Sequence, residues 1–331
     1  SSYAFADCDK VTTVQIGDDI TEIGDYAFSG CISLEKVVFA GTMAKWKEVQ
    51  IGIGNDILNN IEIICTDGSI NTKDENLIIA SGECGSNGAN VIWILNKSGN
   101  LEISGTGSMK DYSNNTTAPW YKRKGNIKSV TINRGVINVG SFAFFECYAI
   151  KDVSIANTVT SIDSAAFLGC SEISNINLPD SITTIGNGAF ACCDSLSHFT
   201  VPSRVTNIED QVFVKCIALK SIVIPDSVTR IGKLTFQGCW SLTNVQIPAS
   251  VIIIDENAFE GCSGIEKFTI PDGVTNIGSY AFLNCKNLTS ITIPSSVKKI
   301  DAYAFDYCGL TSVNYGGTKA QWNEIVINGS N

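Results

Sequence analysis

Apolar residues return at a fixed interval of 23 residues along most of the chain. The clearest marker is a phenylalanine that is followed three residues later by a cysteine. The phenylalanines are Phe5, Phe28, Phe144, Phe167, Phe190, Phe213, Phe236, Phe259, Phe282 and Phe305. The cysteines are Cys8, Cys31, Cys147, Cys170, Cys193, Cys216, Cys239, Cys262, Cys285 and Cys308. A unit this short cannot bury its apolar face alone, so the repeat predicts coils that stack and bury it between neighbours.

The unit around Phe236 shows the elements expected in one coil. Ile222–Ile224 has alternating inward positions and is followed by Pro225, which predicts a short strand because proline removes a ladder donor. Val228–Ile231 predicts a second short strand on the opposite side. The Ala-Phe-x-x-Cys portion, as in 258–262, has helical spacing and predicts a single helical or 3₁₀ turn. The expected fold class is a solenoid that is mainly β, with short helical or 3₁₀ turns.

This unit resembles the repeat of the BspA-like leucine-rich repeat proteins, which runs roughly Ile-Pro-x-x-Val-Thr-x-Ile-Gly-x-x-Ala-Phe-x-x-Cys-x-x-Leu. Ten repeats of the chain match that pattern. The resemblance implies a leucine-rich repeat solenoid in a bacterial protein that is secreted or attached to the cell wall. It also implies a role in adhesion or recognition, and it names no ligand.

Breaks in the repeat predict two blocks with other elements between them. Residues 1–65 hold two repeats, truncated at the start, and a segment around Trp46 that recurs near the end of the chain around Trp322. Each copy follows the last strand of a block, which predicts a cap over the apolar end of a stack. Residues 66–76 are polar and predict a linker, and residues 77–125 predict a small β-hairpin module that caps the second block.

The second block resumes the repeat after that module. Within the module, Val91–Leu95 and Leu101–Ser104 are the predicted hairpin strands. Tyr121 lies 23 residues before the next phenylalanine of the series and marks the return of the repeat phase. Residues 126–315 hold eight repeats, and residues 316–331 form a partial C-terminal cap. The chain starts inside a repeat and stops inside a cap, so we expect a fragment of a longer protein.

The chain holds 13 cysteines, and ten of them are repeat positions. Adjacent coils place equivalent Cα atoms about 4.8 Å apart but keep their Cβ vectors parallel, which favours stacked, buried free thiols over disulfides. Cys65, Cys84 and Cys192 lie outside this ladder, and we expect Cys192 to point outward. No Cys-x-x-Cys pattern occurs, which argues against a zinc site.

Composition and charge exclude several classes of function. With 44% hydrophobic and 17% charged residues the chain is globular, and its formal charge of -10 repels nucleic acids and anionic lipid. The single histidine, His198, leaves few routes to histidine catalysis. Asp67, Ser69 and Asn71 resemble a calcium loop only weakly, because the distal glutamate is missing. We therefore expect no enzyme, no metal and no cofactor.

The candidate binding site is a surface made of residues that lie eight and ten positions after each phenylalanine. These residues are expected to point outward from consecutive strands and to form two columns of mainly small, polar side chains. They are Ser154, Asn175, Asn177, His198, Thr200, Ser221, Val223, Asn244, Gln246, Lys267, Thr269, Ser290 and Thr292. Such a surface can recognise proteins or glycans of host or neighbouring cells. Alternatively the chain is a structural spacer that projects another domain, since threonine and serine also suit any exposed strand.

Overall fold

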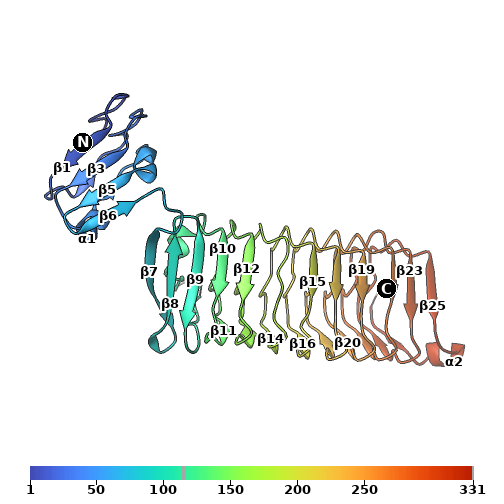
Figure 1. The fold of residues 1–331 in the computed structure, drawn as a ribbon. Coiled ribbons are helices and arrows are strands. Elements are labelled where there is room, and N and C mark those ends of the chain that lie inside the picture. The colour runs from blue at the N-terminus through green and yellow to red at the C-terminus, as the bar shows by residue number, and fades with distance from the viewer. Residues whose placement is uncertain (114–115, 330–331) are drawn as a thin grey trace. The chain divides into compact units, whose positions relative to one another are not determined.

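The computed structural model describes residues 1–113 and 116–329. These residues form two compact units, and each unit is a stack of coils (Figure 1). The units are Ser1–Ile79 with Asn96–Ser98, and Ala80–Leu95 with the chain from Gly99 onward. Each unit has its own cluster of buried apolar side chains. Each therefore has its own hydrophobic core.

The first unit holds the first repeats and the coil that follows them. Its elements are β1 (Thr13–Ile16), β2 (Glu22–Ile23), β3 (Lys36–Phe39), α1 (Met43–Glu48), β4 (Gln50–Ile51), η1 (Asp56–Asn60), β5 (Glu62–Cys65) and β6 (Gly68–Asn71). Strands β1, β3 and β5 pair in parallel, and β2 pairs in parallel with β4. The ring of Trp46 in α1 is buried and meets Phe39 edge-on at 5.2 Å. Helix α1 thus covers the aromatic end of β3.

Residues 66–76 differ from the polar linker that their composition predicts. Strand β6 runs antiparallel to β5, with Ile70 opposite Ile63, and Ile70 is buried. The hydroxyl of Thr72 accepts the N–H of Ile61 at 2.9 Å. Ile70 is the one residue of β6 that is buried, and the polar residues on either side of it face the solvent. The segment therefore extends the sheet of the first unit.

The second unit opens with antiparallel strands that lead into the repeats. They are β7 (Ile78–Gly85), β8 (Gly88–Asn96) and β9 (Asn100–Gly105). The predicted hairpin is present, since β8 and β9 pair antiparallel with Trp93 opposite Ile103. Strand β9 then pairs in parallel with β10 (Ser129–Ile132). The hairpin is thus continuous with the first repeat strands of this unit.

Trp120, and not Tyr121, fills the first aromatic position of the second stack. Trp120 is fully buried, and its ring stacks on Phe144 at 5.7 Å. Its indole N–H donates to the carbonyl of Ala143 at 2.8 Å. Tyr121 starts η2 (Tyr121–Arg123) and is half-buried. The ring is one residue earlier than the repeat spacing predicts, because η2 replaces the turn that positions phenylalanine in the other coils.

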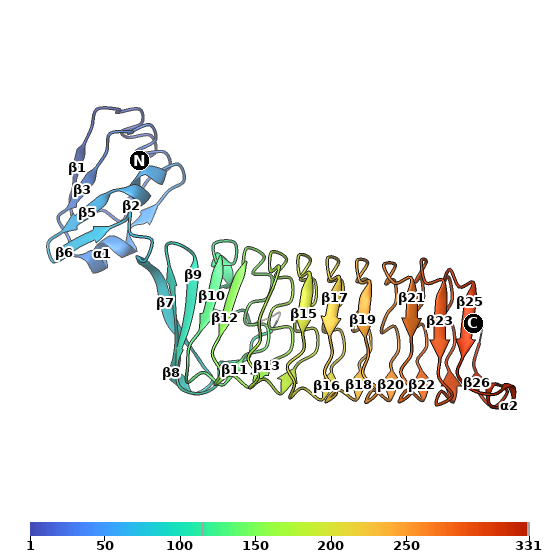
Figure 2. The ribbon, with the colours of Figure 1, turned by 45° about the vertical axis from the view of Figure 1, so that its right-hand side comes forward.

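The repeats give short strands to two sides of the stack, except that segment 174–177 forms no strand (Figure 2). We call one side the strand face; it carries β10, β12 (Asp152–Ile155), β15 (His198–Thr200), β17 (Ser221–Val223), β19 (Asn244–Gln246), β21 (Lys267–Thr269), β23 (Ser290–Ile293) and β25 (Ser312–Tyr315). The opposite side carries β11 (Asn138–Val139), β13 (Ser161–Ile162), β14 (Thr184–Ile185), β16 (Asn207–Ile208), β18 (Arg230–Ile231), β20 (Ile253–Ile254), β22 (Asn276–Ile277), β24 (Lys299–Ile300) and β26 (Val326–Ile327). The two strands predicted for each coil are present in most coils, for example as β17 and β18, but the coil that contains residues 174–177 has only the second, β14.

The third side of each coil is the turn that carries phenylalanine. In the coil of Phe236, Leu234 and Gly238 have positive φ angles of 58° and 72°. The N–H groups of these residues donate to carbonyls of the following coil, at 3.0 Å for Leu234, 2.8 Å for Phe236 and 2.8 Å for Gly238. Cys239 N–H bonds back to the carbonyl of Phe236 at 3.1 Å, which makes the predicted 3₁₀-type turn. Left-handed residues on both sides keep that turn from continuing as a helix.

Stacked phenylalanine rings form the centre of the second core. Successive rings lie 5.1 to 6.0 Å apart between Phe144 and Phe305, with small interplanar angles. Next to each ring from Phe167 to Phe305 a cysteine thiol donates to the phenylalanine carbonyl of the preceding coil, as Cys262 does to Phe236 at 3.1 Å. Cysteine suits this position because it is small and apolar and carries one weak donor. The fold is the leucine-rich repeat solenoid that the sequence predicts.

The tryptophan segment recurs after β25. There α2 (Lys319–Trp322) starts at Thr318, whose hydroxyl accepts the N–H of Gln321 while the Gln321 side chain accepts the N–H of Thr318. The ring of Trp322 meets Tyr315 edge-on at 5.1 Å, much as Trp46 meets its partner in the first unit. The repeated sequence therefore forms the same local structure in both units.

Asn55 completes the last coil of the first unit. Its side chain is buried, and its Oδ1 accepts the N–H of Phe28 at 2.8 Å. Its Nδ2 donates to the carbonyls of Gly24 and Gly52, at 3.0 and 2.8 Å. In the coil of Phe5 and in those from Phe144 to Phe282, a carbonyl of the next coil accepts the phenylalanine N–H. Here an amide side chain supplies the acceptor.

We expect the substitution Asn55→Ala to lower the free energy of unfolding of the first unit by about 1 to 3 kcal/mol. The reason is that the N–H of Phe28 would stay buried without an acceptor. Urea unfolding and the exchange rate of the Phe28 amide measure the effect. Asn60→Ala is the control, because Asn60 is exposed. Equal stability of the two variants would contradict the role of Asn55.

Candidate functional site: the strand face

The thirteen predicted site residues lie on the strand face of the second unit. Ser221, Ser290 and Thr292 are half-buried, and the other ten are exposed. Their outward direction follows from alternation, since Ile222 between Ser221 and Val223 is 3% exposed while Val223 is 60% exposed. The outward orientation of these positions is thus as expected. Their role in binding stays a prediction.

Pairing brings part of the two expected columns together. His198, Ser221 and Asn244 are in register on β15, β17 and β19, and so are Thr200, Val223 and Gln246. Further along, Lys267 is opposite Ser290, and Thr269 is opposite Thr292. These contacts place hydroxyl and amide groups of neighbouring coils side by side.

The strands that carry the two predicted columns do not form one continuous sheet. Asn175 and Asn177 belong to a segment, 174–177, that forms no strand. Strands β15, β17 and β19 make one sheet, and β21, β23 and β25 make another, with no pairing between β19 and β21. The strand face is therefore divided into sections by two openings.

Two polar hollows lie at these openings. One has a volume of about 300 Å³ and extends from β10 across β12 to segment 174–177, where Lys151, Asp152 and Asn175 contribute to its lining. The other has a volume of about 380 Å³ between β19 and β21. Asp152 lies eight residues after a phenylalanine of the series, which is the spacing that defines one of the two columns.

Side chains of this face offer mainly hydroxyl and amide groups. Ser197 Oγ lies 2.9 Å from His198 Nδ1, and both residues are on the surface. Within residues 116–329 no carboxylate hydrogen-bonds to this imidazole, so nothing orients it in the way a catalytic dyad requires. The arrangement provides donors and acceptors for a bound surface.

The cysteines differ in burial according to their place in the stack. All thirteen are free thiols, and burial raises the pKa of Cys147 and Cys239 to about 12. Cys8 and Cys308 are only half-buried, contrary to the expected buried ladder, because each belongs to an outermost repeat. Outside the ladder, Cys65 and Cys84 are buried and Cys192 is half-buried.

The weak calcium pattern has another structural role. A carboxylate oxygen of Asp67 accepts the N–H of Met43 at 2.7 Å, at the start of α1. Ser69 and Asn71 lie on β6, opposite Ile64 and Glu62 of β5. In the described ranges, 1–113 and 116–329, no three histidine, cysteine or acidic side chains gather in a group that could hold a metal ion.

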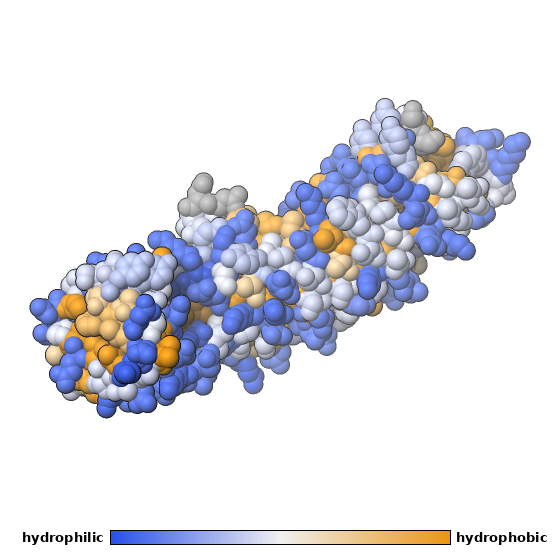
Figure 3. All heavy atoms as spheres, turned by 90° about the horizontal axis from the view of Figure 1, so that it is seen from above, coloured by the Kyte–Doolittle hydropathy of each residue, from blue (hydrophilic) through white to orange (hydrophobic). Residues whose placement is uncertain are grey.

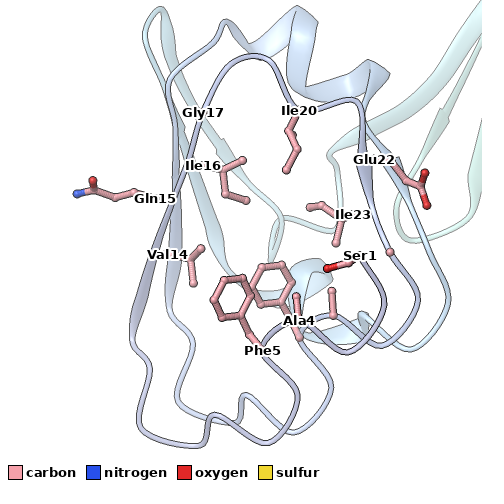
Figure 4. A pocket seen from close by; sticks show the side chains of 13 residues that line it. Ser1, Ala4, Phe5, Val14, Gln15, Ile16, Gly17, Ile20, Glu22 and Ile23 are labelled. Carbon is pink, nitrogen blue, oxygen red and sulfur yellow. The ribbon is translucent and has the colours of Figure 1, made fainter.

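An apolar hollow of about 240 Å³ opens at the first coil of the first unit. Figure 3 shows apolar side chains gathered on this unit, and Figure 4 shows Phe5, Val14, Ile16 and Ile20 around the hollow. In the following coils the equivalent side chains pack against a neighbouring coil, as Phe28 does. The hollow is thus lined by side chains at positions that are buried in the other coils.

Among the helices of the described residues, none is long and apolar enough to cross a membrane.

Parallel coils with a phenylalanine ladder define a leucine-rich repeat solenoid. The family model of the BspA type leucine rich repeat region matches residues 1–67, 118–239 and 206–331, in six copies. The chain belongs to this family. No curated protein matches the chain.

Several solved structures are similar to this chain. A leucine rich cell surface protein from Faecalibacterium prausnitzii is 26% identical over 96% of this chain and 82% of its own, with a TM-score of 0.47. A leucine-rich repeat protein from Eubacterium ventriosum is 23% identical over 71% and 85%, with a TM-score of 0.43. One from Bacteroides ovatus is 21% identical over 73% and 77%, with a TM-score of 0.48.

Proposed function

We propose that this chain is a non-enzymatic recognition module, displayed outside the cell, that binds proteins or glycans through its strand face. The observation that carries the proposal is the strand face itself. It presents outward hydroxyl and amide groups on a fixed backbone, and it is hollowed at two places. Display outside the cell is part of the proposal and is supported by the resemblance of the repeats to the BspA-like proteins.

The shape of the strand face favours recognition over a spacer. A spacer needs only stacked coils with a solvated surface, and a fully paired sheet would serve it. This face instead leaves hollows of about 300 and 380 Å³ lined mainly by polar groups. Concave places at which several polar groups converge are typical of sites that bind a partner.

Four arginines on the strand face test the proposal. In one variant Ser221, Val223, Asn244 and Gln246 become arginine, and we expect at least a tenfold loss of binding, because the long charged side chains cover the polar groups. The melting temperature should stay nearly unchanged, since exposed substitutions cost little. The measurement is binding of the purified chain to immobilised matrix proteins and to mucin-type and N-linked glycans.

The control places arginine on the opposite side of the same stack. Thr206, Thr229, Ile252 and Thr275 are exposed there, so this variant carries the same added charge. It should bind like the parent. Equal binding by both variants would move the site away from the strand face, and no binding by the parent to any of these probes would favour the spacer.

A further inference from the structure

Strands β19 and β21 are neighbours in the stack but leave a slot between them, which we define by residues 243–247 and 265–271. One coil later, Ile270 N–H donates to the carbonyl of Thr292 at 3.0 Å, and Thr289 N–H donates to the carbonyl of Glu266 at 2.9 Å. Within residues 116–329, the equivalent bonds across the slot are absent. Both walls of the slot therefore carry main-chain donors and acceptors that no protein group uses.

A large inward side chain accounts for the slot. Phe268 stands where neighbouring strands carry Val245 and Ile291, and its ring meets Phe259 at 5.2 Å and Phe282 at 4.8 Å. A ring needs more room than a valine, so β21 moves away from the preceding strand. Phe199 is the matching case, because it also lies on a strand, β15, that begins a new sheet.

The other two sides of the stack remain closed at this place. Strand β20 pairs with β22, with Ile254 opposite Ile277. On the turn side, Phe259 N–H donates to the carbonyl of Ala281 at 2.8 Å, and Phe236 N–H donates to that of Ala258 at 2.8 Å. The coils are thus held at their normal spacing except on the strand face. The slot is a fixed feature of the scaffold.

The lining of the slot defines the ligand class that fits it. Its base is apolar and includes Val245 and Phe268, and its rim carries Asn244, Gln246 and Lys267. Phe268 is 5% exposed, so it offers no ring face on which a sugar can stack. Free main-chain groups at strand spacing match an extended peptide, which pairs through its own N–H and C=O groups.

Charge adds a second requirement. Lys267 is the one cation among the thirteen face residues, it is exposed, and among the described residues it makes no ion pair. A carboxylate next to an inward apolar residue of the ligand would lie near this ammonium group. We propose that the slot between β19 and β21 binds an extended peptide that presents alternating apolar side chains flanking an acidic one.

This inference rests on the proposed recognition function, and a blocked pentapeptide tests it separately. The probe is acetyl-Thr-Val-Asp-Val-Thr-amide, titrated into the full ¹⁵N-labelled chain. We expect the largest NMR shifts at the amides of Val245, Ile247, Lys267 and Thr269, and slower hydrogen exchange at the same amides. The same peptide with N-methylated valines should bind at least tenfold more weakly, because it lacks the donors.

Two variants check the structural cause. Phe268→Val should let β19 pair with β21, which closes the slot, slows exchange of the Ile247 amide without peptide, and abolishes peptide binding. Phe199→Val is the matched control and should leave binding unchanged. Lys267→Glu keeps the core intact. It should weaken binding of the acidic peptide at least tenfold, and it should strengthen binding of the same peptide with lysine in place of aspartate.

The outcomes separate this inference from the proposed function. Three results would contradict peptide binding in the slot. They are NMR shifts only outside the slot, binding of the N-methylated peptide equal to that of the unmodified one, and no effect of Lys267→Glu on binding. An oligosaccharide, N-acetyllactosamine, that shifts the slot amides when the peptide does not would overturn the peptide proposal in favour of a glycan. In each case loss of matrix or glycan binding by the four-arginine variant would leave the recognition function standing.

Discussion

The substitution Phe236→Ala is expected to lower the free energy of unfolding by about 3 to 5 kcal/mol. Phe236 is fully buried, and its ring stacks between Phe213 at 5.7 Å and Phe259 at 5.2 Å. Removing the ring leaves a cavity between two coils that the rigid backbone cannot close. Because each coil is stabilised by its neighbours, the loss should also loosen the adjoining coils. Urea unfolding measures the free energy, and amide exchange maps the spread.

Val223→Ala in the same coil is the matched control. Val223 is 60% exposed on the strand face, so its truncation should change the free energy of unfolding by no more than about 0.5 kcal/mol. A similar loss for both variants would show that burial in the stack is not what holds the coils together. A local effect of Phe236→Ala, confined to its own coil, would contradict coupling between neighbours.

Stability should fall steeply as the pH rises above about 9. Burial raises the pKa of Cys84, Cys147 and Cys239 to about 12, and it raises that of the fully buried Cys170 and Cys262 as well. Below pH 9 these thiols are protonated in both states, so their contribution to stability is fully present. Above it the unfolded chain releases protons that the folded chain retains, and stability is lost toward pH 12, by about 1.4 kcal/mol per pH unit for each thiol.

Thermal unfolding between pH 8 and 10.5 measures this dependence. Replacing Cys239 and Cys262 together by alanine should lower stability at neutral pH but reduce the slope by about 2.8 kcal/mol per pH unit. Tyrosine and lysine titrate equally in both proteins, so the difference isolates the two thiols. A melting temperature that is flat up to pH 10.5, or equal slopes in the two proteins, would contradict protonated thiols in the folded core.

Repetition made most of the second unit predictable. One coil predicts little, but the same apolar positions around Phe236 and Phe282 recur in phase, and a position that repeats must face the same environment in each coil. The strands, the ring stack and the thiol ladder follow from that argument. The outward direction of residues such as Val223 also follows, because side chains of a strand alternate.

Features that depend on one side chain were not predictable from the repeat. Phe268 and Ile291 count equally as apolar in the pattern, yet the size of Phe268 accompanies the division of the strand face. Asn55 looks polar and exposed in sequence, yet its amide is buried because a main-chain N–H needs an acceptor there. Ile70, a single apolar residue in a polar stretch, fixes a strand. Such effects depend on the size of one side chain and on whether a buried N–H group has an acceptor, and neither can be deduced from composition.

Between coils, the main-chain hydrogen bonds of the phenylalanine turns run from one coil to the next, and this has a consequence for how repeats can be gained or lost in evolution. From Phe144 to Phe282, each coil donates the N–H of its phenylalanine to a carbonyl of the next coil, as Phe236 does to Ala258. Adding or deleting a whole 23-residue unit by recombination between similar repeats leaves every remaining donor matched to an acceptor. A partial unit would break the match. The length of the strand face can therefore change in whole coils, whereas the amide of Asn55, which accepts the last phenylalanine N–H of the first unit, lies outside the repeats.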